Sequence, residues 1–280
     1  MKTEFISSFD GTRLQTRTWL AENNSKGNII FCHGLFEYAG RYAYEAEFFN
    51  RLGYNFYSFD QRTHGESGGK RRAYIKSFDL YAKDYAIIVH HIIEMSDKPV
   101  FLFSHSMGCT VMLTYLISQK FSADAFRGVV MSGPFIKAVD DMAPILQKLA
   151  GIVARLLPNI KTIAARPNTI SRDKEEVRKY INDPLVYTDG MYAVTGYNML
   201  AQGKWLMSRL EKFDYPFLIM HGTDDALANI QGSEKLYEVS PSQDKTFIPL
   251  KDHKHEITRE LERDKVLQQM ADWMDERLCS

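Results

Sequence analysis

The chain carries the stretch Phe101-Leu102-Phe103-Ser104-His105-Ser106-Met107-Gly108-Cys109, in which an apolar strand runs into a tight turn and then into a helix. A nucleophile elbow of pattern G-x-S-x-G requires this context, because the sharp turn holds a serine hydroxyl above the edge of a parallel sheet. Ser104 replaces the first glycine and Gly108 keeps the second, so small residues stand where strand and helix come close. Ser106 could instead be an ordinary helix cap. The apolar segments on both sides favour the elbow and predict Ser106 as a nucleophile.

Strand and helix patterns alternate on either side of this stretch. A hairpin signal, Asp10-Gly11, separates apolar runs at residues 5–8 and 14–19 and predicts an antiparallel edge. Helical patterns occupy residues 44–52, 81–95 and 107–119, and further short apolar runs that end in turn residues occupy 28–32, 55–59, 100–103, 128–131, 217–220 and 245–248. Buried strands that alternate with amphipathic helices predict an α/β fold with a mainly parallel sheet covered on both faces.

The alternation stops between Pro134 and Phe213, where the chain reads as helix and loop without a convincing strand. One helix is expected over residues 143–157, between Pro144 and Pro158, and a second opens near Ser171, which could cap it. The first helix carries an apolar stripe at Ile145, Leu149, Ile152, Val153 and Leu156, with Gln147, Lys148 and Arg155 off the stripe. An insertion of this kind after the sixth strand predicts a lid over the carboxyl edge of the sheet, where open α/β folds bind ligands.

The apolar stripe of the first inserted helix admits three interpretations. It could be buried against the core, as most such helix faces are. It could form the apolar entrance of a substrate tunnel, which contacts a membrane or micelle and takes up acyl chains. It could also be a dimer interface, because the sequence leaves the oligomeric state open.

A serine nucleophile needs a base and an orienting carboxylate, which in this fold follow in the order serine, acid, histidine, each behind a later strand. Asp224 and Asp225 follow the run at 217–220, and His253 and His255 follow the run at 245–248. Taken singly, each group could be a solvated loop residue. Three groups in the required order predict a Ser-Asp-His site.

Composition excludes several classes of protein. The 280 residues contain 35 basic and 35 acidic side chains, whereas phosphate-contacting nucleic-acid binders and polybasic membrane proteins carry a basic excess. Cys32, Cys109 and Cys279 are odd in number and scattered, so they form neither a disulfide framework nor a metal knuckle. No signal peptide or membrane span is visible. We expect a cytoplasmic protein.

Several motifs resemble those of the monoacylglycerol lipase and lysophospholipase group of serine α/β-hydrolases, and the resemblance covers nearly the whole chain. His33-Gly34-Leu35-Phe36-Glu37-Tyr38-Ala39-Gly40-Arg41-Tyr42 is similar to H-G-x-x-E-H-x-x-R-Y, with Tyr38 in place of histidine. Asp60-Gln61-Arg62-Thr63-His64-Gly65-Glu66-Ser67 is similar to D-x-R-G-H-G-x-S, with Thr63 in place of glycine. Within the insertion, Ile170-Ser171-Arg172-Asp173 and Asn182-Asp183-Pro184-Leu185 resemble landmarks of the group's lid.

The resemblance implies a single hydrolase domain over residues 1–280 with a helical lid at 134–213, and it assigns roles to matching positions. Ser106 is the implied nucleophile, Asp225 rather than Asp224 the acid, and the backbone N–H groups of Leu35 and Met107 the oxyanion hole. The H-E-x-x-x-E pattern fits His255, which we favour as the base, whereas a P-x-x-x-H pattern fits His253.

The implied reaction is hydrolysis of a monoacylglycerol or lysophospholipid ester, with transient membrane contact through the lid. This reaction needs no metal or organic cofactor. A general carboxylesterase or peptidase and a non-catalytic binding protein of the same fold are the alternatives. His33 and His64 precede Ser106, which is the wrong order for the base, so we interpret them as structural or pocket-lining. Cys109 is interpreted as a small packing residue.

Overall fold

The computed structural model describes residues 1–22, 24–119, 125–139, 144–163 and 166–278. Two positions considered above, Ala143 and Cys279, lie outside the described residues, as do the side chains of residues 144–148, Ile145, Gln147 and Lys148 among them. Among the described residues, every helix is too short or too polar to cross a membrane.

Eight of the described strands form one sheet in the order β1-β2-β4-β3-β5-β6-β9-β10. β1 and β2 form the antiparallel edge hairpin, β2 is also antiparallel to β4, and the remaining pairs are parallel. The predicted α/β fold with an antiparallel edge is therefore confirmed. The strand bounds are β1 (Lys2–Ser7), β2 (Arg13–Trp19), β3 (Gly27–Cys32), β4 (Tyr54–Phe59), β5 (Val100–His105), β6 (Gly128–Ser132), β9 (Phe217–Gly222) and β10 (Lys245–Leu250).

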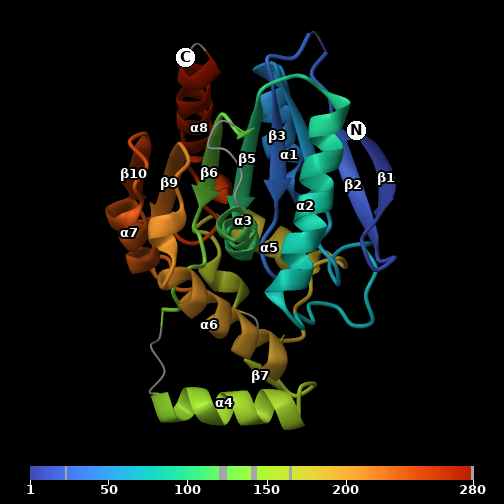
Figure 1. Cartoon of the computed structure of the whole chain (residues 1–280), viewed down its shortest axis with the longest axis vertical. Coiled ribbons are helices and arrows are strands. Elements are labelled where there is room, and N and C mark those ends of the chain that lie inside the picture. The colour runs from blue at the N-terminus through green and yellow to red at the C-terminus, as the bar shows by residue number, and fades with distance from the viewer. Residues whose placement is uncertain (23, 120–124, 140–143, 164–165, 279–280) are drawn as a thin grey trace.

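Helices cover both faces of this sheet (Figure 1). Alternate strand residues point to opposite faces, so Ile29 and Phe31 of β3 join the core under α1 (Ala43–Arg51) and α8 (Arg263–Leu278). Ile30 and Cys32 join the opposite core, under α2 (Phe78–Met95), α3 (Met107–Ser118) and α7 (Ile230–Val239). Every residue of β3 is buried, because a central strand is covered on both faces.

The segment between β6 and β9 lies at the end of the sheet where the parallel strands finish (Figure 1). It contains α4 (Pro144–Leu156), α5 (Lys174–Asn182) and α6 (Ala193–Met207). α4 packs on α6, where an added Cβ at Gly151 would meet the Tyr197 ring at 3.0 Å. The segment is thus placed where the sequence predicts an insertion; that it acts as a lid stays a prediction.

Two expectations for this segment are wrong. It does contain strands, β7 (Lys161–Ile163) and β8 (Met191–Tyr192), which pair antiparallel. With three and two residues, these strands are too short to show an alternating pattern. Ser171 is not the cap of α5. Asp173 is, because its side chain accepts a hydrogen bond from the N–H of Glu175 at 2.8 Å.

Most of the described apolar stripe on α4 faces solvent rather than the core. The exposed fractions of Leu149, Ile152, Val153 and Leu156 run from 37% to 71%. Ala154, off the stripe, is the buried residue of this turn. Burial against the core therefore does not account for these four side chains.

The elbow depends on a close approach between α3 and the end of β3. A Cβ added at Gly108 would lie 2.1 Å from the backbone oxygen of Cys32, a distance no side chain tolerates. The obstacle is backbone in the middle of the sheet, so it cannot rotate away.

We predict that Gly108→Ala lowers the free energy of unfolding by about 1–3 kcal/mol, the range of an overpacked core, as measured by urea denaturation. The matched control is Gly196→Ala in α6, where the added Cβ meets only the end of the Met191 side chain, at 3.4 Å. There alanine should be neutral or stabilise by up to about 1 kcal/mol, because it is the better helix former. Equal losses in both variants would contradict the close approach.

Candidate active site

Ser106 lies between β5 and α3 in a backbone conformation that side chains rarely adopt, with φ 52° and ψ −119°. Such a conformation costs on the order of 1–3 kcal/mol and persists only where the surroundings fix it. Here the N–H of Ser106 donates to the Ser132 oxygen of β6 at 3.0 Å. The Ser106 side chain makes no capping hydrogen bond to α3, so it is not an ordinary helix cap.

The hydroxyl of Ser106 instead meets His255, from the loop after β10. His255 Nε2 lies 2.8 Å from Ser106 Oγ, and His255 Nδ1 lies 2.7 Å from Asp225 Oδ2, in the loop after β9. The carboxylate can only accept, so Nδ1 carries the proton and Nε2 is left to accept the proton of the hydroxyl. The structure brings together the three side chains that the sequence pattern singled out.

The carboxylate of Asp225 is held from both sides. Its Oδ1 accepts hydrogen bonds from the backbone N–H groups of Leu227 and Ala228, at 2.8 and 2.9 Å. His221 Nε2 lies 3.1 Å from Oδ2. Asp224, by contrast, is exposed, so the structure places only the second acid of the pair beside the imidazole.

His253 points away from this group. Its Nδ1 lies 2.9 Å from the backbone oxygen of Lys251, and its Nε2 is 3.5 Å from Glu262 Oε2. Of the two histidines that the sequence left open, His255 is the one beside Ser106.

The charges around His255 make its imidazole a stronger base. Burial by itself would lower the pKa of His255, but the charge of Asp225 and its hydrogen bond outweigh burial and raise it. Burial likewise opposes ionisation of Asp225, and His255 and His221 together hold the pKa of its carboxyl well below the usual range. His105, whose ring centroid is 4.8 Å from that of His255, has its pKa lowered to about 4 by burial and by His255. At neutral pH His105 is therefore uncharged and does not compete for the proton.

Two backbone N–H groups are available beside the serine. Gly34 packs against Ser106 so closely that an added Cβ would lie 3.2 Å from Ser106 Cβ, and Leu35 follows it. Met107 opens α3, where the first N–H groups of a helix have no partner within the helix. Among the described residues, the N–H groups of Leu35 and Met107 donate to no protein acceptor. Both are free to bind a developing negative charge.

The inserted segment anchors the loop that carries His255, which the sequence did not predict. Glu256 donates its N–H to the Ile170 oxygen at 2.7 Å, and Ser171 Oγ donates to the Arg259 oxygen at 2.8 Å. The fully buried Glu260 accepts from the N–H and Nε of Arg172 and from the N–H of Lys254. The sequence indicated these contacts only in that residues 170–172 and 255–260 belong to motifs quoted above.

The remaining candidates are structural. His33 is buried, with Nδ1 2.8 Å from the Gly34 oxygen and Nε2 accepting from the N–H of Gln61 at 2.9 Å. His64 is buried with Nδ1 3.0 Å from the Arg62 oxygen. Burial raises the pKa of the Cys109 thiol, which leaves it protonated and inert. In the part of the chain that is described, no group of three or more His, Cys, Asp or Glu residues could hold a metal ion.

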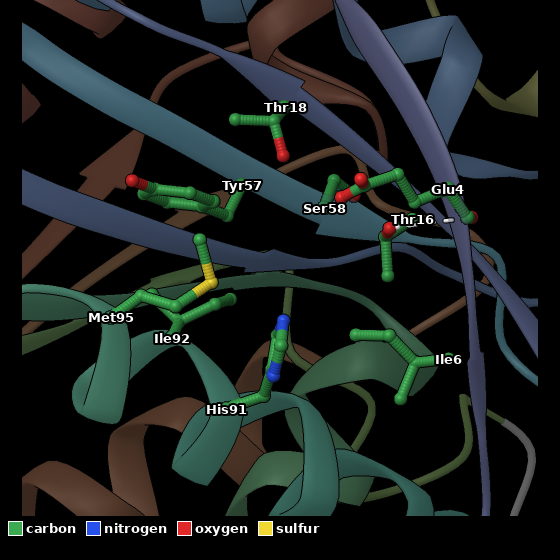
Figure 2. Close-up of a pocket in the computed structure, with 9 residues that line it drawn as sticks. All are labelled: Glu4, Ile6, Thr16, Thr18, Tyr57, Ser58, His91, Ile92 and Met95. Carbon is green, nitrogen blue, oxygen red and sulfur yellow. Dashed lines mark hydrogen bonds between the residues drawn. The ribbon is translucent and has the colours of Figure 1, made fainter.

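A small pocket lies elsewhere, between the edge hairpin and α2 (Figure 2). Met95 of α2 points toward Tyr57 of β4, and His91 of α2 points toward the strands that carry Ser58 and Thr16. Its volume of about 20 Å³ suffices for a water molecule but not for an acyl chain. None of its lining residues belongs to the group around Ser106.

Known proteins resemble the chain over most of its length. A family model described as "Serine aminopeptidase, S33" matches residues 23–262. The monoacylglycerol lipase of Mycolicibacterium smegmatis is 28% identical over 267 residues, which cover 94% of this chain and 93% of that protein. The monoglyceride lipase of Rattus norvegicus is 30% identical over 274 residues, which cover 96% of this chain and 89% of that protein.

A solved structure resembles the fold. The crystal structure of the Paleococcus ferrophilus monoacylglycerol lipase matches with a TM-score of 0.82 and 27% identity, covering 94% of this chain and 99% of that one.

The electrostatics of His255 predict the pH dependence of any reaction that uses it as a base. Only the neutral imidazole can accept a proton, and its pKa is raised, so the acid limb of kcat/KM should fall above the ordinary value of about 6.5. Asp225→Asn removes the charge that raises this pKa; the limb should move to lower pH and kcat should fall by about 10⁴-fold.

The control for this experiment is Asp224→Asn, in the exposed neighbouring carboxylate, which should leave the profile unchanged. An acid limb that stays in place in Asp225→Asn would show that this carboxylate does not govern the base.

Proposed function

The chain belongs to the serine aminopeptidase S33 family of α/β-hydrolases, and on that basis we propose that it hydrolyses the carboxylic ester of a monoacylglycerol through an acyl-enzyme. The observation that carries the proposal is the hydrogen-bonded line from Ser106 Oγ through His255 to Asp225, with distances of 2.8 and 2.7 Å. The substrate class follows from the monoacylglycerol and monoglyceride lipases to which the chain is similar over nearly its whole length.

In the first half of the reaction, Ser106 Oγ attacks the ester carbonyl carbon while its proton passes to His255 Nε2. Asp225 stabilises the resulting imidazolium, and the N–H groups of Leu35 and Met107 hold the oxyanion. When the tetrahedral intermediate collapses, the bond to the glycerol oxygen breaks and His255 gives that oxygen the proton. In the second half, water attacks the acyl-Ser106 ester, His255 again takes and returns the proton, and the fatty acid leaves.

Two other substrates have specific support. The family description names an aminopeptidase, and an amide is cleaved by the same sequence of steps with an amine as leaving group. The resemblance to lysophospholipases favours an ester with a phosphate-bearing head group. All three share the acyl-enzyme and differ only in what leaves.

We predict that a fluorophosphonate labels the wild-type chain but not Ser106→Ala, and that Ser106→Ala lowers turnover of 2-oleoylglycerol by about 10⁶-fold, because the nucleophile is gone. His255→Ala should lose activity to a similar degree and His253→Ala should keep it. Turnover of lysophosphatidylcholine and of an aminoacyl-p-nitroanilide, measured in parallel, shows which leaving group the enzyme prefers. Labelling that survives Ser106→Ala, or a wild-type chain that cleaves no ester, would refute the ester hydrolase.

The segment at 134–213 is proposed to act as a lid whose α4 face contacts lipid. Its four exposed stripe residues continue into Leu157, Ile160 and Ile163, which are also exposed, by 44% to 53%. Single exposed apolar residues are ordinary on a protein surface, but a contiguous group of them marks an interaction site. A lipid surface fits this group, because the substrate itself resides in one and the chain has no charge excess with which to bind it otherwise.

The double variant Ile152→Glu, Leu156→Glu should bind phosphatidylcholine vesicles at least about tenfold more weakly, since each side chain forfeits the transfer of apolar surface from water, as measured by vesicle co-sedimentation. Turnover of the water-soluble ester p-nitrophenyl butyrate should not change. Leu20→Glu is the control, because Leu20 is 63% exposed but lies outside the segment. Unchanged vesicle binding together with a change from dimer to monomer would favour the dimer interface instead.

A further inference from the structure

A buried arginine stands between the two loops that supply the oxyanion hole and the base. Arg41 lies in the short helical turn Ala39–Tyr42 that precedes α1, and its side chain is 5% exposed. Its guanidinium binds two carboxylates, those of Glu37 and Glu256, which are equally buried. Neither sequence spacing nor charge pattern predicts that Glu256 joins this cluster, because Glu256 lies 215 positions from Arg41 along the chain.

On one side, Arg41 fixes the loop that holds Gly34 against the serine. Arg41 Nη1 donates to Glu37 Oε2 at 2.5 Å. The other oxygen of Glu37 accepts from the N–H of Gly34 at 2.6 Å and from the Tyr42 hydroxyl at 2.8 Å. The position of Gly34, and with it that of the Leu35 N–H that follows, therefore depends on Glu37 being held in place.

On the other side, Arg41 fixes the loop that holds the base. Its Nη1 and Nη2 donate to the two oxygens of Glu256, both at 2.9 Å, and Glu256 is the residue directly after His255. A bidentate pair of this kind fixes the orientation of the carboxylate as well as its distance. The backbone N–H of Glu256 is at the same time bound to Ile170.

The cluster is charged and closed to solvent. Burial by itself would raise the pKa of Glu256, but Arg41 and Arg259 outweigh burial and hold it at about 2. Burial would also lower the pKa of Arg41, and its two carboxylate partners raise it well above its usual range instead. Each charge is thus stable only while its partner stays, because a buried ion without a partner is strongly unfavourable.

The inserted segment closes the third side. The ring of Tyr180 in α5 lies over the Arg41 guanidinium at 4.6 Å. Glu176 of the same helix binds Arg259 Nη1 at 3.2 Å, and Arg259 donates to the backbone oxygen of Arg41. One face of α5 therefore packs against the cluster.

We propose that Arg41 is a positioning residue, which sets the distance between the oxyanion loop and the base loop through its simultaneous bonds to Glu37 and Glu256. The inference rests on the proposed function, because it takes Leu35 and His255 to act on one substrate. A displacement of about 1 Å between reacting groups costs on the order of 10²-fold in rate, so a bridge between two loops from opposite ends of the chain has a direct effect on turnover.

The test uses Arg41→Lys, which keeps the charge but cannot form the bidentate bond to Glu256 while it binds Glu37. With p-nitrophenyl butyrate, kcat should fall by about 10- to 100-fold, whereas KM should change by less than about threefold, because Arg41 does not bind the substrate. Glu256→Gln should give a loss of the same kind. The losses of Arg41→Lys and Glu256→Gln should not multiply in the double variant, since both break one bridge.

A triple variant separates positioning from stability. Arg41→Met combined with Glu37→Gln and Glu256→Gln leaves no buried unpaired charge, so its thermal midpoint should recover relative to Arg41→Met alone, while its kcat should stay low. Recovery of kcat along with the midpoint would overturn the proposal and leave Arg41 a merely stabilising residue.

The control pair lies on another part of the fold. Arg62 binds Asp84 with the same bidentate geometry, at 2.5 and 2.6 Å, and both side chains are buried. Asp84→Asn should lower the thermal midpoint and leave kcat unchanged. A wild-type chain that cleaves no ester refutes the proposed function, whereas an active wild type with an unchanged kcat in Arg41→Lys refutes only the positioning role.

Discussion

The left-handed turn at Ser106 is the constraint on which the rest of the site depends. A serine at φ 52° is unfavourable in isolation, so the structure must hold it from every side. The N–H bond to Ser132 of β6 fixes one side, and the contact of Gly108 with the Cys32 carbonyl of β3 fixes another. The two strands that flank β5 therefore set the position of the hydroxyl, and the loops at the same edge of the sheet bring His255 and Asp225 to it.

Buried ion pairs fix the positions of the loops around the site. The chain as a whole is neutral, yet buried ions lie around the site: Asp225 beside His255, Arg41 between Glu37 and Glu256, and Glu260, which binds the half-buried Arg172. Buried ion pairs add little net stability compared with apolar residues of the same shape. What they supply here is geometry, because the Arg41–Glu256 and Arg172–Glu260 pairs join loops that lie 215 and 88 positions apart along the chain. The inserted segment takes part in this through residues 170–182, while the apolar side chains of α4 stay on the outside.

Sequence patterns predicted the sheet well because each strand of a covered sheet appears in the sequence as a short apolar run that ends in turn residues. The runs at 28–32, 55–59, 100–103, 128–131, 217–220 and 245–248 all fall within strands of the sheet, and the hairpin around Asp10-Gly11 forms the edge. β7 and β8 could not be predicted, since strands of three and two residues are too short to show a periodic pattern. Serine is a common helix-capping residue, which is why the sequence predicts Ser171 as the cap of α5. In the structure the Ser171 hydroxyl donates to the Arg259 backbone oxygen instead. Capping preferences describe neighbouring residues in the chain and cannot predict a hydrogen bond to a distant one.

The sequence by itself determined which residue types follow which strand. Because the carboxyl ends of parallel strands lie at the same edge of a sheet, this order also determined that a serine, an acid and a histidine meet there. It also narrowed the acid and the base to two neighbouring candidates each. Only the tertiary structure decided that His255 rather than His253 lies beside Ser106, since a separation of two residues in a loop is resolved by what the loop packs against. The same holds for Arg41: its partners stand 4 and 215 positions away along the chain, and only the folded molecule brings both to one guanidinium.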